Sequence, residues 1–313
     1  MPSSTLPKVR PLAGSGVSRR AMHYGPRKHP VSRCQEYTPH VAGPGGPNSN
    51  GVRAMLRRLA VTACAAILAL ANASTAQAIT NGKPDFTHTY TGAIVAVGDS
   101  FGPDPIAYCS GTLVAPTVFV TAAHCLVDQP ADVTFLGITF DQDLTDGITR
   151  ITPIASLVPH PDYPGVENHD IFTDIGVVRL SQPVTDVGFA TLPTLNQFAG
   201  LKPGPRSWFT KVGYGIQVYK GSQLVDISAR YMATSQLIKT YDSGNSSVWS
   251  VSGAKGTGGG TCFGDSGGSV LWQDTNILAA VHSSGFKQCV MHGFEVRLDT
   301  PLAQAFLRQF VSL

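Results

Sequence analysis

The sequence lacks several features that would place it in other classes of protein. Its apolar run from Leu59 to Leu70 is too short for a comfortable membrane span. After residue 78 no cysteines have the paired Cys-x-x-Cys spacing of a zinc site, and we expect neither a metal nor a cofactor. Residues 79–313 contain 13 Lys and Arg against 19 Asp and Glu, a net charge of −6. This balance argues against a nucleic-acid-binding surface.

The basic charge of the chain lies in its first 78 residues, which contain ten Lys and Arg and one Glu. Residues 1–54 are rich in Pro, Gly, Ser, Arg and His and bury too little apolar surface to fold, so they are a disordered leader or an over-extended start. Residues 55–78 have the basic start, apolar core and small final residues of a secretory signal peptide. Small-x-small cut sites follow Ala73 and Ala78, and the second would release Ile79 directly. We therefore expect a secreted protein.

The region after the leader has the pattern of an all-β sandwich or barrel. Short runs of Val, Ile, Thr and Leu alternate with clusters of Gly, Pro, Asn and Asp; the runs are 93–97, 113–114, 118–121, 133–138, 175–180 and 277–281. Helical periodicity appears only at the end, where Asp299-Thr300 can cap a helix with Pro301 in its first turn. The apolar face of this helix would hold Leu302, Phe306, Leu307 and Phe310.

Four cysteines remain after the leader: Cys109, Cys125, Cys262 and Cys289. An even number in an exported chain predicts two disulfides, and the count alone leaves three connectivities open.

Three segments contain the parts of a nucleophilic active site, and they are Thr121-Ala-Ala-His-Cys125, Asp174-Ile-Gly-Val-Val178 and Gly264-Asp-Ser-Gly-Gly268. A serine between glycines, a histidine and an aspartate that opens an apolar strand can together activate a hydroxyl. Their order, His then Asp then Ser, and their contexts resemble those of the chymotrypsin/trypsin-like serine proteases. The resemblance covers roughly residues 79–313.

The resemblance implies two six-stranded antiparallel β-barrels packed face to face, a C-terminal helix and an active site between the barrels. The N-terminal barrel would occupy residues 79–190 and the C-terminal barrel and helix residues 191–313. The activity implied is that of a serine endopeptidase that forms an acyl-enzyme.

The same resemblance assigns roles to individual residues. Ser266 would be the nucleophile, His124 the general base and Asp174 the carboxylate that orients His124. Asp170 competes for the third role, but it lies in a polar stretch and we expect it to be solvated. The amides of Gly264 and Ser266 would form the oxyanion hole.

Two further features are implied by the resemblance. The α-amino group of Ile79, freed by cleavage, would pair with Asp265, because a buried carboxylate is costly without a partner. The disulfides would be Cys109–Cys125 and Cys262–Cys289.

The substrate pocket implied by the resemblance has Gly260 at its base and small residues, Ser283, Gly285 and Gly293, at its walls. An uncharged open slot favours an apolar or aromatic residue before the cut. Glu295 competes with this interpretation, because a carboxylate that reached the pocket floor would favour a basic residue.

Two alternative functions stay open. Gly264–Gly268 also fits the nucleophile elbow of α/β-hydrolases, although that motif requires a helix after the serine and Val270-Leu-Trp272 looks like a strand. A binding protein on an inactive protease scaffold is the other alternative. For the favoured function we expect protein or peptide substrates, protein protease inhibitors as candidate partners, a monomer, and no nucleic acid or stable membrane anchor. Asp141, Asp143 and Asp146 resemble a calcium loop, but no Glu closes it and a polar turn is favoured.

Overall fold

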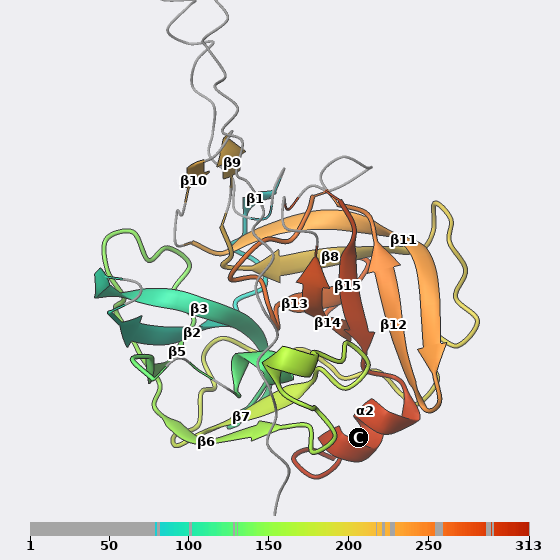
Figure 1. The fold of residues 1–313 in the computed structure, drawn as a ribbon, viewed down its shortest axis with the longest axis horizontal. Helices are drawn as coiled ribbons and strands as arrows, with labels where there is room; N and C mark the ends of the chain where they lie inside the picture. Colours follow the sequence, from blue (N-terminus) through green and yellow to red (C-terminus); the bar gives the residue numbers. More distant parts are fainter. Residues whose placement is uncertain are drawn as a thin grey trace, which may run out of the picture. The chain divides into compact units, whose positions relative to one another are not determined.

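Two antiparallel β-sheets account for most of the regular structure in this computed structural model (Figure 1). The structure describes residues 79, 82–99, 102–127, 129, 131–216, 218–220, 223–225, 229–253, 259–285, 289 and 291–312. All of them belong to one compact unit, residues 71–313. The leader expected at 1–54 and the signal peptide expected at 55–78 lie outside the described residues.

The first sheet has six strands in the order β5-β2-β3-β4-β7-β6. Its strands are β2 (Thr91–Gly98), β3 (Gly102–Ala115), β4 (Val118–Thr121), β5 (Thr134–Thr139), β6 (Ile154–Pro159) and β7 (Gly176–Leu180). A bridge between Ile138 of β5 and Thr152, just before β6, brings the two edges of the sheet together. Short 3-10 turns, η1 (Ala123–Cys125) and η2 (Val166–Asn168), lie in its connections.

The second sheet closes on itself, because β11 pairs with both β12 and β8. Its strands are β8 (Trp208–Gly213), β11 (Tyr231–Ser243), β12 (Ser246–Val251), β13 (Ser269–Trp272), β14 (Leu278–Gly285) and β15 (Gly293–Arg297). The short β1 (Lys83–Pro84) also pairs with β11, so the first described strand belongs to the second sheet and not to the N-terminal barrel. A separate two-stranded sheet contains β9 (Val218–Lys220) and β10 (Gln223–Val225).

Apolar packing joins the two sheets. A single buried cluster includes Ile94 and Val177 of the first sheet and Leu271 and Val281 of the second. The strands that contribute to it are those expected from the Val-rich runs, and every residue of β4 is buried. Burial of such side chains is the main favourable contribution to folding.

Buried hydroxyl groups also fix one sheet against the other. The Ser269 Oγ atom, at the start of β13, lies 2.6 Å from the Oγ1 atoms of both Thr91 in β2 and Thr112 in β3. Buried polar groups require such partners. The contact holds the loop before β13, which contains Ser266, beside the first sheet.

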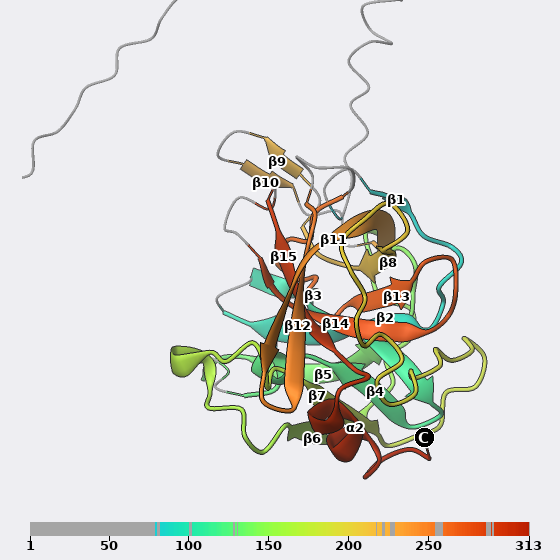
Figure 2. The same ribbon diagram turned by 90° about the vertical axis from the view of Figure 1, so that its right-hand side faces the viewer.

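The C-terminal helix α2 (Pro301–Leu307) begins as its sequence predicts. The Thr300 side chain accepts a hydrogen bond from the amide of Ala303, and Pro301 occupies the first turn. Phe306 is buried, and its ring lies 5.1 Å from that of His160, just after β6. Figures 1 and 2 both show α2 beside the first sheet, so the end of the chain packs back on its N-terminal half.

The predicted fold class is confirmed: the regular structure of the described residues is nearly all strand, with one closed six-stranded barrel, one more open barrel and a C-terminal helix. The α/β-hydrolase alternative is wrong, because the segment after Ser266 continues into strand β13 and not into a helix. Within the described ranges, no helix has the length and apolar character needed to cross a bilayer.

Candidate active site

Pairing of β4 with β7 brings His124 beside Asp174. Thr121, the last residue of β4, is the register partner of Gly176, the first residue of β7. His124 lies three residues beyond Thr121, in the turn η1, and Asp174 lies two residues before Gly176. The small residues Ala122 and Ala123 are fully buried and let this turn pack closely under the sheet.

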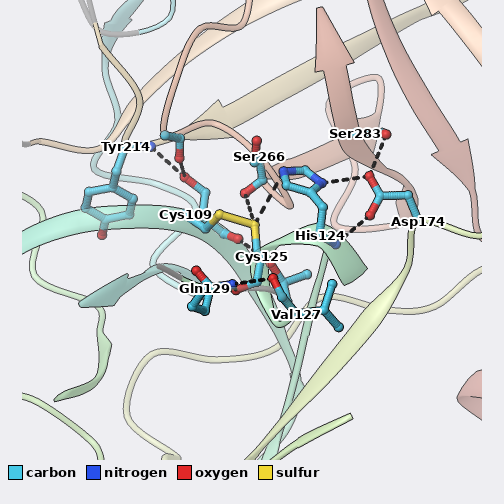
Figure 3. Close-up of a disulfide and its surroundings, with 12 residues drawn as sticks. Cys109, His124, Cys125, Val127, Gln129, Asp174, Tyr214, Ser266 and Ser283 are labelled. Atoms are coloured by element: carbon cyan, nitrogen blue, oxygen red, sulfur yellow. Dashed lines mark hydrogen bonds and ion pairs between the residues drawn. A yellow bond between two sulfur atoms is a disulfide. The ribbon is translucent and has the colours of Figure 1, made fainter. Parts of the chain in front are cut away.

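The two side chains are in direct contact (Figure 3). The Nδ1 atom of His124 lies 2.8 Å from Oδ2 of Asp174, and the backbone amide of His124 donates to Oδ1 at 2.9 Å. The hydroxyl of Ser283 donates to Oδ2 at 2.6 Å. Burial alone would raise the pKa of Asp174, but these bonds and the charge of His124 outweigh it and hold the pKa below its usual range. Asp174 is therefore ionised and fully buried.

Ser266 reaches the same place from the second sheet. Its backbone carbonyl accepts a hydrogen bond from the amide of Ser110 in β3 at 2.8 Å. The Cys125 Sγ atom lies 3.7 Å from that carbonyl oxygen and 3.8 Å from Nε2 of His124, and Figure 3 shows Ser266 beside the His124 ring. Both residues line one cavity of about 330 Å³.

Glycine is required beside Ser266. Gly267 has a φ of +76°, and an added Cβ would overlap Oγ1 of Thr121 and the carbonyl oxygen of Ser110. Gly264 has a φ of +91°. In the described part of the chain, the backbone amides of Gly264 and Ser266 donate no hydrogen bond to protein groups. Two amides are therefore available near the serine.

Asp265 points away from Ser266 into the protein. It is 1% exposed, and its carboxylate accepts hydrogen bonds from the amides of Gly215 and Cys262, both at 2.8 Å. Burial raises the pKa of Asp265 to about 6, although these two bonds oppose the change. Ile79 is also fully buried, and its carbonyl accepts from the amide of Gly82. In the intact chain Ile79 has no free amino group to offer Asp265.

His169 is a neighbour that sequence reasoning missed. Its Nε2 atom lies 3.9 Å from Oδ2 of Asp174 and 3.3 Å from Oγ of Ser283, and its ring packs edge-on against His124 at 5.5 Å. Nδ1 of His169 contacts the Tyr163 hydroxyl at 2.8 Å. Burial lowers the pKa of His169, which favours a neutral ring. Its polar context in the sequence contains no signal of this placement.

Two groups of possible metal donors include His124 in the described part of the chain, and in one of them the other two members, Cys109 and Cys125, are joined in a disulfide. His124, His169 and Asp174 have donor atoms within 4.8 Å of one another. The Asp174 carboxylate is already engaged by three protein donors, so this geometry favours a hydrogen-bonded cluster.

Comparison with known proteins identifies the family of this site. The family model described as Trypsin matches residues 80–302. The chain belongs to the trypsin family. It is 29% identical over 203 residues to a trypsin of Saccharopolyspora erythraea, covering 63% of this chain and 82% of that protein. It is 27% identical over 220 residues to melanization protease 1 of Drosophila melanogaster, covering 60% and 54%.

Solved structures agree on the fold. A collagenase designated HL superposes with a TM-score of 0.58 at 16% identity, covering 75% of this chain and all of that one. Neuropsin, a serine protease of mouse brain, gives 0.54 at 18% identity, covering 74% and 99%. The family makes this protein a serine endopeptidase that acts on proteins or peptides.

Among the residues expected to form the substrate pocket of this trypsin-family protein, Ser283 and Gly285 line the cavity together with Ser266. Gly293 is the register partner of Gly285 across β14 and β15 and is not itself among the lining residues. Gly260 is buried and is not part of the lining. The remaining lining residues are His124, Val166, His169, Thr261, Cys262, Phe263, His282, Ser284 and Cys289.

Glu295 does not offer a free carboxylate to this pocket. It is fully buried, its Oε1 atom lies 2.7 Å from Nζ of Lys211, and its Oε2 atom lies 3.0 Å from Nδ1 of His282. Burial alone would raise the pKa of Glu295, but the charges of Lys211 and His282 hold it below its ordinary value. The charge of Glu295 is thus already neutralised by Lys211, which removes the reason to expect a basic preference.

The other expected features occupy distinct places. Both disulfides, Cys109–Cys125 and Cys262–Cys289, are present. Asp170 accepts bonds from the amide of Phe172 and the hydroxyl of Thr173 and does not contact His124.

The acidic residues that resemble a calcium loop lie in a turn between β5 and β6. Asp141 accepts hydrogen bonds from the amides of Thr149 and Arg150, and Asp143 accepts from Thr145. Both carboxylates are therefore used to shape a polar turn.

Proposed function

We propose that this protein is a secreted serine endopeptidase in which Ser266, His124 and Asp174 form a catalytic triad. The observation that carries the proposal is the 2.8 Å contact between His124 Nδ1 and the buried Asp174 carboxylate, with Ser266 on the other side of the ring in the same cavity. A carboxylate on Nδ1 fixes the tautomer that leaves Nε2 free to accept a proton.

In the first half of the reaction, Oγ of Ser266 attacks the carbonyl carbon of the scissile peptide bond while His124 Nε2 takes the hydroxyl proton. The amides of Gly264 and Ser266 donate to the oxyanion that forms, and Asp174 stabilises the imidazolium. His124 then gives the proton to the leaving amine as the C–N bond breaks, which leaves an ester on Ser266. In the second half a water molecule loses its proton to His124 and attacks the ester, and the proton returns to Ser266.

Activation would follow from a single cut. Cleavage after Ala78 frees the α-amino group of Ile79, and Asp265 is the buried carboxylate that this cation would neutralise. In the described part of the chain, the hydrogen bonds to the Asp265 carboxylate come from two amides. Even with the charges of His282 and Lys211 nearby, burial raises the pKa of Asp265 to about 6, which supports a missing cationic partner in direct contact. Removal of the signal peptide and activation would then be one event. N-terminal sequencing of the secreted protein should give Ile79 as the first residue, whereas Ser74 would exclude this form of activation.

The setting of the enzyme is part of the proposal. Two disulfides are typical of an oxidising compartment, which supports secretion. We expect it to act as a monomer, with protein protease inhibitors as candidate partners. Gly260 and the small residues at the pocket walls led to the expectation of an apolar or aromatic residue before the cut. This preference stays a prediction.

Reaction with a fluorophosphonate tests the function. The cleaved protein should be labelled once, on the peptide that contains Ser266, and Ser266→Ala should not be labelled. Absence of label on folded, cleaved protein would favour the alternative of an inactive protease scaffold.

A further inference from the structure

Three ionisable side chains from three strands of the closed barrel form a connected group, and one of them, His282, lines the cavity. Lys211 comes from β8, His282 from β14 and Glu295 from β15, and all three are nine-tenths buried or more. The structure links them as Lys211 Nζ to Glu295 Oε1 at 2.7 Å, and Glu295 Oε2 to His282 Nδ1 at 3.0 Å. The proposed triad does not use this group.

The group lies directly behind the two strands that form the pocket wall. A Cβ added to Gly293 would lie 2.7 Å from Oε1 of Glu295 and 2.9 Å from Nζ of Lys211. A Cβ added to Gly285 would lie 4.0 Å from Cε1 of His282. Glycine at both positions therefore lets the backbone of the pocket wall pack closely against the buried group.

His282 is the member of this group that reaches the cavity. Its ring lines the same cavity as Ser266. Nδ1 is occupied by Glu295, with Oγ1 of Thr261 at 3.3 Å, whereas Nε2 has no protein partner in the described part of the chain. A carboxylate at Nδ1 fixes the proton there, so Nε2 is the atom that a ligand would meet.

Lys211 is also incompletely satisfied. It is 1% exposed, and Glu295 is the only acceptor near its ammonium group within the described ranges. An ammonium group has three donors, and unpaired buried donors are costly. Oε1 of Glu295, its ion-pair partner, likewise has no further hydrogen bond in the described part of the chain, so the two groups depend on each other.

Charge balance then discriminates between occupants of the cavity. The charges of Lys211 and Glu295 cancel. The nearby Asp265 carboxylate interacts electrostatically with Lys211 and His282, but its hydrogen bonds come from the amides of Gly215 and Cys262. An apolar side chain would leave Nε2 of His282 without a partner. A basic side chain would add an uncompensated cation beside Lys211. An anionic side chain would favour the uptake of a second ring proton at Nε2 and would accept a hydrogen bond from it.

We propose that the cavity beside Ser266 binds an acidic side chain, so that the enzyme cleaves after Glu or Asp. This proposal rests on the proposed function and names the substrate class of the same site. His282 would be the residue that contacts the substrate carboxylate. Glu295 and Lys211 would be positioning residues: Glu295 holds the His282 ring through Nδ1, and Lys211 neutralises Glu295. The lining also offers the hydroxyl groups of Thr261 and Ser284 beside the apolar side chains of Val166 and Phe263.

The test compares peptide p-nitroanilides that differ only in the residue before the cut: Glu, Gln, Leu and Lys. Glu and Gln have the same shape, so their ratio isolates the charge. We expect kcat/KM for Glu to exceed that for Gln by at least about tenfold, which corresponds to a charge-assisted hydrogen bond. The Lys substrate should be cleaved least. A higher kcat/KM for Leu or Lys than for Glu would overturn the proposal.

Two matched variants assign the preference to His282. His282→Asn keeps a donor near Nδ1 for Glu295 and removes Nε2, so the Glu/Gln ratio should fall to about one. His160→Asn is the control, because His160 is also a buried histidine but packs against Phe306 away from the cavity. That variant should keep the wild-type ratio. An unchanged ratio in His282→Asn, with folding verified by its thermal melting, would contradict the assignment.

A binding measurement separates failure of this proposal from failure of the catalytic mechanism. Fluorescent peptides with Glu or Gln at the central position are titrated with cleaved protein that has Ser266→Ala, and anisotropy reports binding. Tighter binding of the Glu peptide supports the acidic pocket even if no peptide is hydrolysed by the wild-type protein. Equal binding of both peptides would overturn the pocket assignment, even if Ser266 reacts with a fluorophosphonate.

Discussion

Asp265 should give the intact chain an unusual pH dependence of stability. It is almost completely buried, and burial raises its pKa from 3.8 to about 6. The folded state therefore binds this proton more tightly than the unfolded state, and the free energy of unfolding falls as the pH rises between about 4 and about 6. The difference between 3.8 and about 6, at about 1.4 kcal/mol per pH unit, corresponds to roughly 3 kcal/mol. This cost is absent below about pH 4 and complete above about pH 7.

The assay is urea unfolding of the intact chain with Ser266→Ala, which prevents self-cleavage. Asp265→Asn in the same background provides the reference, because it removes the titrating group. Other groups shift the curve in the opposite sense, such as Asp174, whose lowered pKa contributes stability that is lost as the pH falls. These contributions cancel in the difference between the two proteins. That difference should change by roughly 3 kcal/mol between about pH 4 and about pH 7. A difference that is constant over this range would refute the reasoning.

The same measurement on protein that begins at Ile79 tests the activation step. Pairing with the new α-amino group would stabilise the ionised form of Asp265 and lower its pKa. The fall in stability between about pH 4 and about pH 6 should then disappear. Its persistence in the cleaved protein would show that Ile79 and Asp265 do not pair.

Three further substitutions have expected outcomes. Asp174→Asn should lower kcat by about 10⁴-fold, as is typical of this change in chymotrypsin-like proteases. Asp170→Asn, the control, should change kcat less than about threefold. Equal effects of the two substitutions in steady-state kinetics would show that the assignment of Asp174 is wrong. Ser283→Ala removes a hydrogen bond to a buried carboxylate and should lower kcat roughly 10- to 100-fold; an unchanged kcat would exclude a role in orienting Asp174. Gly267→Ala should lower the free energy of unfolding in urea by at least about 1 kcal/mol more than the control Gly188→Ala does. Both glycines have a φ near +75°, but of the two only Gly267 has close neighbours that an added Cβ would overlap. Equal losses of stability would contradict this packing argument.

Local signals explain what the sequence could predict. The apolar runs predicted β2, β3, β4, β5, β7 and β14 at least in part, and Thr300 with Pro301 predicted the C-terminal helix, because each depends on neighbouring residues alone. The other strands of the second sheet, such as the long β11, were not among these runs. The motifs around His124 and Ser266 predicted the residues that meet in the cavity. The aspartate between those motifs was distinguished from Asp170 by the apolar strand that follows it.

Non-local contacts explain what the sequence could not predict. The pairing of β1 with β11 joins segments about 150 residues apart and has no local signature. Lys211, His282 and Glu295 meet because β8, β13, β14 and β15 lie side by side in the second sheet, which no local pattern shows, so Glu295 was considered without the cation that neutralises it. The one available signal was the presence of opposite charges within otherwise buried strands, at Lys211 in β8 and Glu295 in β15.

The central claim is that Ser266 and His124 act as one acylating unit. The most direct test is the kinetics of Ser266→Ala, His124→Ala and the double variant, measured on cleaved protein with one peptide substrate. Residues that act as a unit have strongly non-additive effects, so the double variant should lose no more kcat/KM than either single variant. Losses that multiply in the double variant would show that the two side chains act independently and would contradict the account.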